Sequence, residues 1–269
     1  MCSSDLTARV DTVLAQLEVH VAQTLADLTI VAGNGQSHTV GTPVPQPPTV
    51  RARDANGYPI AGLTVVFRPT SGGGSVIDSV QVTNELGLAV PGNWTLGTTP
   101  GPNTLLASSS GLSALFDAIG VTGPVSSATS LITVAQSSVV AGGATTLQLQ
   151  TRDQLGNPLT TGGLVVAFAA SGGTSDGSSG PVVDHLTGTY TATFPGLTAG
   201  TPTTIGATIN TNVVTSALPN VTVVAGAPVR LAITAGDAQQ AVAGSAVPVP
   251  PTVVAYDQFD NPVDRKSVG

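Results

Sequence analysis

The feature that most constrains this chain is an internal repeat. Residues 28–60 align with residues 231–263 at a constant offset of 203 without a gap, and 15 of the 33 positions are identical. The first copy reads LTIVAGNGQSHTVGTPVPQPPTVRARDANGYPI and the second LAITAGDAQQAVAGSAVPVPPTVVAYDQFDNPV. A more divergent copy lies between them at residues 131–159. Such repetition indicates a chain that is built from several similar structural units.

Each copy contains the pattern Asp-x-x-(Gly/Asp)-x-Pro, which predicts a turn. In this pattern the Asp side chain accepts hydrogen bonds from backbone amides ahead of it, Gly supplies a positive φ, and Pro fixes the exit. A calcium-binding loop is the alternative, but Val65 stands where a bidentate Glu would close such a loop. We therefore interpret the pattern as a turn. Its three occurrences are Asp54/Gly57/Pro59, Asp153/Gly156/Pro158 and Asp257/Asp260/Pro262.

Apolar and polar residues alternate on both sides of these turns. Such a period of two, with many β-branched residues, predicts half-buried antiparallel strands. The turns are 99 and 104 residues apart, which is the size of an immunoglobulin-type β-sandwich. The predicted fold class is therefore all-β, with tandem immunoglobulin-like β-sandwich modules built from antiparallel sheets. The apolar sets are Val50/Ala52, Leu63/Val65/Phe67, Leu147/Leu149, Leu164/Val166/Phe168 and Tyr190/Ala192/Phe194.

The repeats predict module boundaries at residues 28–124, 125–228 and 229–269, the last being a truncated third module. Residues 9–28 have few helix breakers, yet the alternation in Leu17–Val21 favours a strand. We expect residues 1–27 to hold the last strand of a truncated preceding module. Both ends, Met1–Leu6 and Asp264–Gly269, resemble translated sequencing adapter, so we expect a fragment of a longer protein with adapter-like ends.

Composition excludes several classes of protein. The net charge of −7 argues against nucleic-acid binding, which needs clustered Lys and Arg. A single Cys excludes a disulfide framework and a Cys-rich zinc site. No run of about 18 apolar residues indicates a membrane span. Met1–Leu6 has neither the basic start nor the apolar block of a secretory signal.

A search for reactive side chains yields no catalytic, cofactor-binding or metal-binding residue. His20, His38 and His185 lack metal-ligand spacing, and Asp184-His185 has no nucleophile elbow to accompany it. Two other features have an alternative functional reading. Trp94 is either a core residue, which we favour, or a platform for stacking a ligand. Arg51, Arg53 and Arg68 are either an ordinary solvated face, which we favour, or a local basic set for a partner.

The module resembles the bacterial immunoglobulin-like domains of the invasin and intimin group, called Big-1 modules. Residues 172–174 and 188–191 depart from that pattern and resemble a filamin-like or invasin-like variant, and the third copy ends its match at Val263. The resemblance implies a non-enzymatic, secreted or surface-displayed protein without catalytic residues or a cofactor. The residues that carry it are Val50–Pro59, Gly62–Phe67, Ser71–Ser75, Thr83 with Gly87 and Ala89, and Trp94–Thr98.

Two functions from different classes fit these observations. The first is a structural stalk or spacer in a large bacterial secreted or cell-surface protein, whose partners are neighbouring modules of the same chain. The second is an adhesin module that binds a surface protein or a glycan through loops or an edge strand. A sandwich that flanks a lost catalytic domain is a distant third. The sequence predicts an extracellular or cell-surface location.

Overall fold

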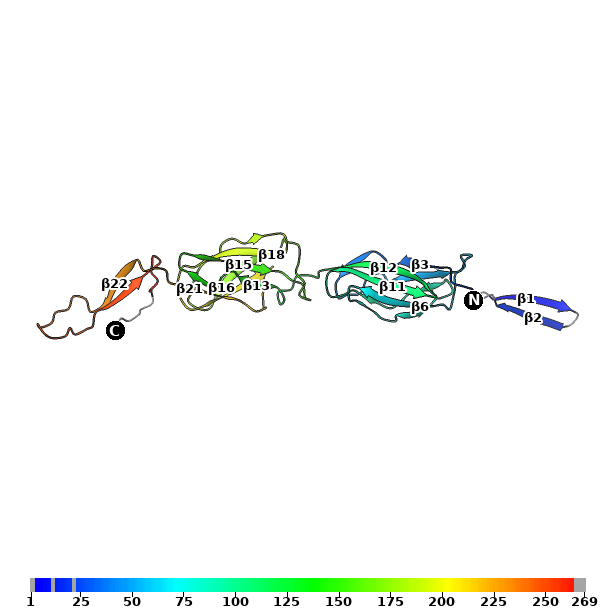
Figure 1. Cartoon of the computed structure of the whole chain (residues 1–269), viewed down its shortest axis with the longest axis horizontal. Helices are drawn as coiled ribbons and strands as arrows, with labels where there is room; N and C mark the ends of the chain where they lie inside the picture. The colour runs from blue at the N-terminus through cyan, green and yellow to red at the C-terminus, as the bar shows by residue number, and fades with distance from the viewer. Residues whose placement is uncertain (1–2, 11–12, 21–22, 264–269) are drawn as a thin grey trace. The chain divides into compact units, whose positions relative to one another are not determined.

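The computed structural model describes residues 3–10, 13–20 and 23–263, and it divides into two compact units, Met1–Gly123 and Pro124–Gly269 (Figure 1). The described residues form β-strands and contain no helix. Consequently, this part of the chain has no helix that could cross a membrane. The prediction of an all-β fold is confirmed.

The first unit contains a β-sandwich. Its larger sheet has the order β4-β12-β11-β6-β8, and its smaller sheet has the order β3-β5-β9. The strands β7 and β10 form a separate two-stranded sheet. These strands are β3 (Asp27–Ala32), β4 (Gln36–Thr39), β5 (Thr49–Arg53), β6 (Thr64–Ser71), β7 (Ser75–Val76), β8 (Val80–Val82), β9 (Leu88–Ala89), β10 (Trp94–Thr95), β11 (Gly101–Ser109) and β12 (Leu112–Val121).

The core of this sandwich follows the alternation in the sequence. In β5 the side chains of Val50 and Ala52 are fully buried, and Arg51 and Arg53, which alternate with them, are half-buried. In β6 Val65 and Phe67 are buried while their neighbours are exposed. Since strand side chains point alternately to opposite faces, one set from each sheet meets in a shared core.

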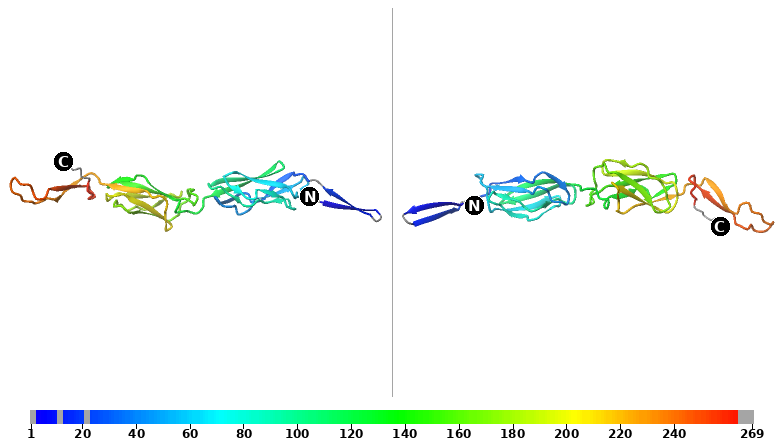
Figure 2. Two further views of the ribbon diagram at one scale, coloured as in Figure 1. Left: turned by 90° about the horizontal axis from the view of Figure 1, so that it is seen from below. Right: turned by 180° about the vertical axis from the view of Figure 1, so that it is seen from behind.

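The second unit contains a sandwich with the same layout. One sheet has the order β13-β15-β18-β17, and the other has the order β14-β21-β19-β16, with β20 paired to β19. Figure 2 draws this sandwich in green and yellow. Residues from both sheets form its core, with Leu149, Tyr190 and Val221 almost fully buried. These strands are β13 (Leu131–Val134), β14 (Ser138–Val140), β15 (Ala144–Gln150), β16 (Val166–Ser171), β17 (Val183–Asp184), β18 (Thr189–Pro195), β19 (Thr203–Ile209), β20 (Asn212–Val213) and β21 (Asn220–Val224).

One detail of the predicted sheets is corrected by the structure, because not every pairing is antiparallel. In the first sandwich β4 pairs parallel with β12, and in the second β14 pairs parallel with β21. Both cases have one cause. The first stretch of each module starts in one sheet (β3 or β13) and crosses to the other (β4 or β14). Gly33 and Gly35, both at positive φ, lie at the first of these crossings.

The second unit also contains a two-stranded ribbon of β22 (Arg230–Ala235) and β23 (Thr252–Tyr256). This ribbon repeats the pairing of β3 with β5, including a register shift after the Ile of each first strand. Its apolar face is open. Leu231 is 73% exposed, whereas its repeat counterpart Leu28 is 7% exposed. The difference arises because no second sheet of the described chain covers the ribbon.

The N-terminal segment is an antiparallel hairpin of β1 (Ser3–Val10) and β2 (Val13–His20). The strand β2 therefore contains Leu17–His20, which is most of the segment for which the alternation predicts a strand rather than a helix. The adapter-like tail at 264–269 lies outside the described residues. The adapter origin of both ends and the predicted module boundaries stay predictions.

Candidate functional site

The three repeated turns share one geometry, in which the Asp side chain organises the backbone. In each, Oδ1 of the Asp accepts hydrogen bonds from the amides two and four residues ahead, at 2.8–3.0 Å. The residue three positions after the Asp has a positive φ: Gly57, Gly156 and Asp260. A Pro then closes each turn by a β-bridge to the residue that precedes the Asp. The turn interpretation is therefore confirmed.

The third turn, residues 257–262, contacts the end of the second sandwich. We call this segment the Asp257 turn. The Asn261 side chain accepts a hydrogen bond from the amide of Ala199 at 2.7 Å and donates one to the carbonyl of Leu197 at 2.9 Å. Oδ2 of Asp257 accepts from the amide of Gly226 at 2.8 Å. The turn therefore joins the β22–β23 ribbon to the sandwich that precedes it in the chain.

The carboxylate of Asp257 is nearly inaccessible to solvent, with an exposed fraction of 2%. Burial alone would raise its pKa. The hydrogen bonds it accepts from the Gly226 amide, the Asn261 side chain, and the Asn261 and Phe259 amides outweigh that effect. They lower the pKa of Asp257 from its ordinary value of 3.8 to about 2. The carboxyl group is thus ionised at neutral pH, and these hydrogen bonds stabilise its charge. We call the contact between the Asp257 turn and the end of the second sandwich the joint.

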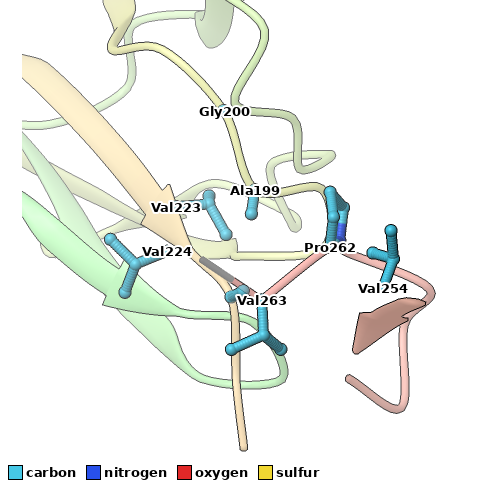
Figure 3. Close-up of a pocket in the computed structure, with 8 residues that line it drawn as sticks. Ala199, Gly200, Val223, Val224, Val254, Pro262 and Val263 are labelled. Carbon is cyan, nitrogen blue, oxygen red and sulfur yellow. The ribbon is translucent and has the colours of Figure 1, made fainter. Parts of the chain in front are cut away.

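Apolar contacts surround this polar centre. A Cβ built on Gly142 would lie 2.6 Å from Cε2 of Phe259, so the Phe ring packs directly against this glycine. A cleft of about 630 Å³ opens beside the turn. Figure 3 shows its two sides. One side consists of Ala199, Gly200, Val223 and Val224 of the sandwich, with Ala225 directly after it. The other side consists of Val254 of the ribbon, with Pro262 and Val263 that follow the ribbon in the chain.

Asp260 takes the place that Gly occupies in the other two turns. Its φ of +62° is a left-handed conformation that costs a residue with a Cβ about 1 kcal/mol. Nη2 of Arg230 contacts Oδ1 of Asp260 at 2.6 Å. The guanidinium of Arg230 also lies 4.3 Å from the ring centroid of Tyr256. These contacts tie the turn to both strands of the ribbon.

The two histidines whose side chains are described belong to different units. His38 lies in β4 of the first unit and His185 in the second, while the side chain of His20 lies outside the described residues. Nε2 of His185 contacts Oγ1 of Thr191 at 2.8 Å, and the neighbouring Asp184 accepts backbone hydrogen bonds. Among the described residues, no three His, Cys, Asp or Glu side chains form a metal-binding cluster.

The two features with an alternative functional reading are also located. Trp94 is 1% exposed and lies in the core of the first sandwich, so the core interpretation is correct. Arg51 and Arg53 project from the outer face of the small sheet, whereas Arg68 projects from the large sheet on the opposite side. The three arginines therefore do not form one basic surface. The joint at Asn261 was not found from the sequence, although its Asn-Pro lies within the repeat.

Comparison with known proteins gives a family match for part of the chain. Residues 126–226, which span the second sandwich, match the family described as invasin, domain 3. No curated protein sequence matches the chain. The match supports the resemblance to invasin-type and intimin-type bacterial immunoglobulin-like modules, and it agrees with the prediction of a non-enzymatic protein.

Solved structures of bacterial proteins are similar to this chain. The structure of the Escherichia coli adhesin FdeC is 23% identical to this chain. The match covers 91% of this chain and 78% of the FdeC chain, with a TM-score of 0.53. Yersinia pseudotuberculosis InvD is 23% identical to this chain. The match covers 88% of this chain and 72% of the InvD chain, with a TM-score of 0.50. Invasin, a bacterial integrin-binding protein, is 22% identical over 88% of this chain, with a TM-score of 0.47. The chain spans about half the length of that invasin structure.

Proposed function

We propose that this chain, whose second sandwich is an invasin-type immunoglobulin-like module, is a non-catalytic stalk or spacer of a larger bacterial cell-surface or secreted protein. The observation that carries the proposal is the joint at the Asp257 turn. There, two hydrogen bonds join Asn261 to the sandwich end, and a third joins Asp257 to Gly226 of the connecting segment. A stalk needs such joints because a module that swings freely does not hold a distal part away from the cell.

The connection itself also limits bending. The second sandwich passes into the ribbon through Ala225-Gly226-Ala227-Pro228, a short connecting segment that includes a proline. The Gly226 amide is bound by Asp257, so the more flexible residue of the connecting segment is held by the turn. The connecting segment is therefore restricted in two ways: by the ring of Pro228 and by the hydrogen bond from Gly226 to Asp257.

The surface chemistry of the chain suits an exposed spacer. The net charge is −7, and Lys266 is the only lysine. An acidic surface with few cations is repelled by anionic envelope polymers rather than adsorbed to them. The strand β12 has ten residues, and at about 3.3 Å per residue a sandwich of this kind adds about 33 Å to a stalk.

Small-angle X-ray scattering on the full chain tests this proposal. A compact globule of this length has a radius of gyration of about 18 Å. Modules arranged as a rod of about 100 Å give roughly 30 Å, from about three modules of 33 Å each. A value near that of the globule refutes the stalk, whereas a value near that of the rod supports it.

The second candidate function is an adhesin module that binds a surface protein or a glycan directly. The match of residues 126–226 to an invasin domain and the likeness to FdeC, an adhesin, favour it. The test is adherence of cells to the full chain immobilised on beads, compared with beads that carry an unrelated acidic protein. Adherence above that control supports direct binding, and its absence leaves the spacer.

A further inference from the structure

We propose that the end of the second sandwich is a docking surface specific for an Asp-x-x-x-Asn-Pro turn in the module that follows, and that Asn261 determines this fit. The docking surface consists of Gly142, Leu197 and Ala199. The proposal rests on the proposed stalk function and adds the kind of partner that the sandwich end accepts.

The first argument is the chemistry that Asn261 provides. Its side-chain amide carries a donor and an acceptor side by side, and the structure uses both toward one short segment: the carbonyl of Leu197 and the amide of Ala199. The same Nδ2 also donates to Oδ2 of Asp257 at 3.0 Å. A carboxylate lacks the donor, and an apolar side chain lacks both groups; the tyrosine hydroxyl has both, but it stands at the far end of a ring and cannot take the place of the short Asn amide. Only Asn or a similar amide satisfies this segment.

The second argument is that docking and turn formation use different groups. The Asp54 turn of the first unit has the same backbone hydrogen bonds as the Asp257 turn, but Tyr58 occupies the position of Asn261. Tyr58 is 62% exposed. Oδ2 of Asp54 is contacted instead by the side chain of Gln23 at 3.3 Å. The turn thus forms without Asn, so the Asn is not needed for the turn itself.

The third argument is burial. Asn261 is 3% exposed, whereas Asn157 at the same position of the second turn is half-buried; the turn Asp is buried in both. Buried polar groups cost free energy unless they are paired. Here the two side chains are paired with each other, Asn261 also with the sandwich end, and Asp257 also with the amide of Gly226. The ring of Phe259 on Gly142 adds an apolar contact that a Cβ at position 142 would obstruct. The contact is therefore built from complementary polar and apolar groups.

The experiment replaces Asn261 by the residue of the first unit, Asn261→Tyr, in the full chain. Amide hydrogen exchange, followed by NMR, reports the joint at Ala199 and the turn at Asp260, whose amide donates to the carbonyl of Asp257. We expect exchange at Ala199 to accelerate about tenfold or more, because its amide loses its acceptor. Exchange at Asp260 should stay within about twofold, because the turn does not need the Asn. The matched control, Tyr58→Asn, should leave both sites unchanged.

A second variant covers the case in which tyrosine disrupts the turn and Asp260 also exchanges faster. Asn261→Asp keeps an acceptor for Ala199 but places a carboxylate against the carbonyl of Leu197 and beside Asp257. Faster exchange at Ala199 in this variant, with Asp260 protected, supports the proposal. Unchanged protection at Ala199 in either variant overturns it. Scattering on the unsubstituted chain tests the stalk separately, so a failure of one proposal is distinguishable from a failure of the other.

Discussion

Truncation of Trp94, the only tryptophan of the chain, tests whether this residue serves the fold or a ligand. The side chain is 1% exposed, and the carbonyl of Trp94 accepts a hydrogen bond from the amide of Val44 at 2.9 Å. It belongs to the core cluster of the first sandwich, together with Phe67 and Phe116. A side chain in this position stabilises the sandwich by excluding water from both sheets at once.

The magnitude follows from this burial. Trp94→Ala removes a fully buried indole and should cost about 3–5 kcal/mol. For a domain of about a hundred residues, 1 kcal/mol shifts the melting temperature by about 4–8 °C, so the expected decrease is about 12–40 °C. Trp94→Phe removes roughly three buried heavy atoms and should cost about 2 kcal/mol. The Phe variant remains measurable if the Ala variant is unfolded.

Differential scanning calorimetry of the full chain is the assay. We expect one transition to move, that of the first unit, because Trp94 belongs to the core of the first sandwich. The exposed Tyr58→Ala serves as the control and should stay within about 0.5 kcal/mol of the unsubstituted chain. A shift below about 2 °C for Trp94→Ala, or tryptophan fluorescence that acrylamide quenches as freely as in a short peptide, would refute the burial argument.

Three further predictions concern single groups. Gly142→Ala places a Cβ 2.6 Å from the ring of Phe259 and strains a φ of +89°, so exchange at the sandwich end should accelerate, and unchanged exchange contradicts this. Thr83→Val leaves the amide of Leu63 and a buried carbonyl unpaired and should cost about 2–4 kcal/mol in urea unfolding; a cost below about 0.5 kcal/mol speaks against it. Since the pKa of Asp257 is lowered to about 2, its stabilisation of the joint should be complete above about pH 5 and lost progressively as the pH falls toward 2. NMR titration of the carboxylate checks this, and a midpoint near 3.8 argues against it.

The repeated turns show how much of the fold local sequence predicts. The pattern Asp-x-x-(Gly/Asp)-x-Pro predicts an Asp that accepts backbone amides, and the structure contains that arrangement three times. The alternation around Val50 and Leu147 likewise predicts which side chains are buried. These predictions succeed because the hydrogen bonds span at most four residues and the side-chain period of a strand is fixed by its backbone.

The candidate site shows where local sequence stops being informative. Asn261 looks like any turn residue in the sequence, since Asn is common in turns. Its hydrogen bonds reach residues 62 and 64 positions earlier in the chain, and no short pattern contains both partners. Arg68 is a second example. It is close to Arg51 in the sequence, which suggested one basic set, but the two residues lie on different sheets.

The sequence by itself therefore determined the alternation of the strands and the three turns, because each depends on neighbours within a few residues. Only the tertiary structure decided the parallel pairings of β4 and β14, the burial of Asp257 and the partners of Asn261. Those features depend on which distant backbone groups are left unpaired when a sandwich closes. That is a property of the assembled sheets rather than of any segment within them.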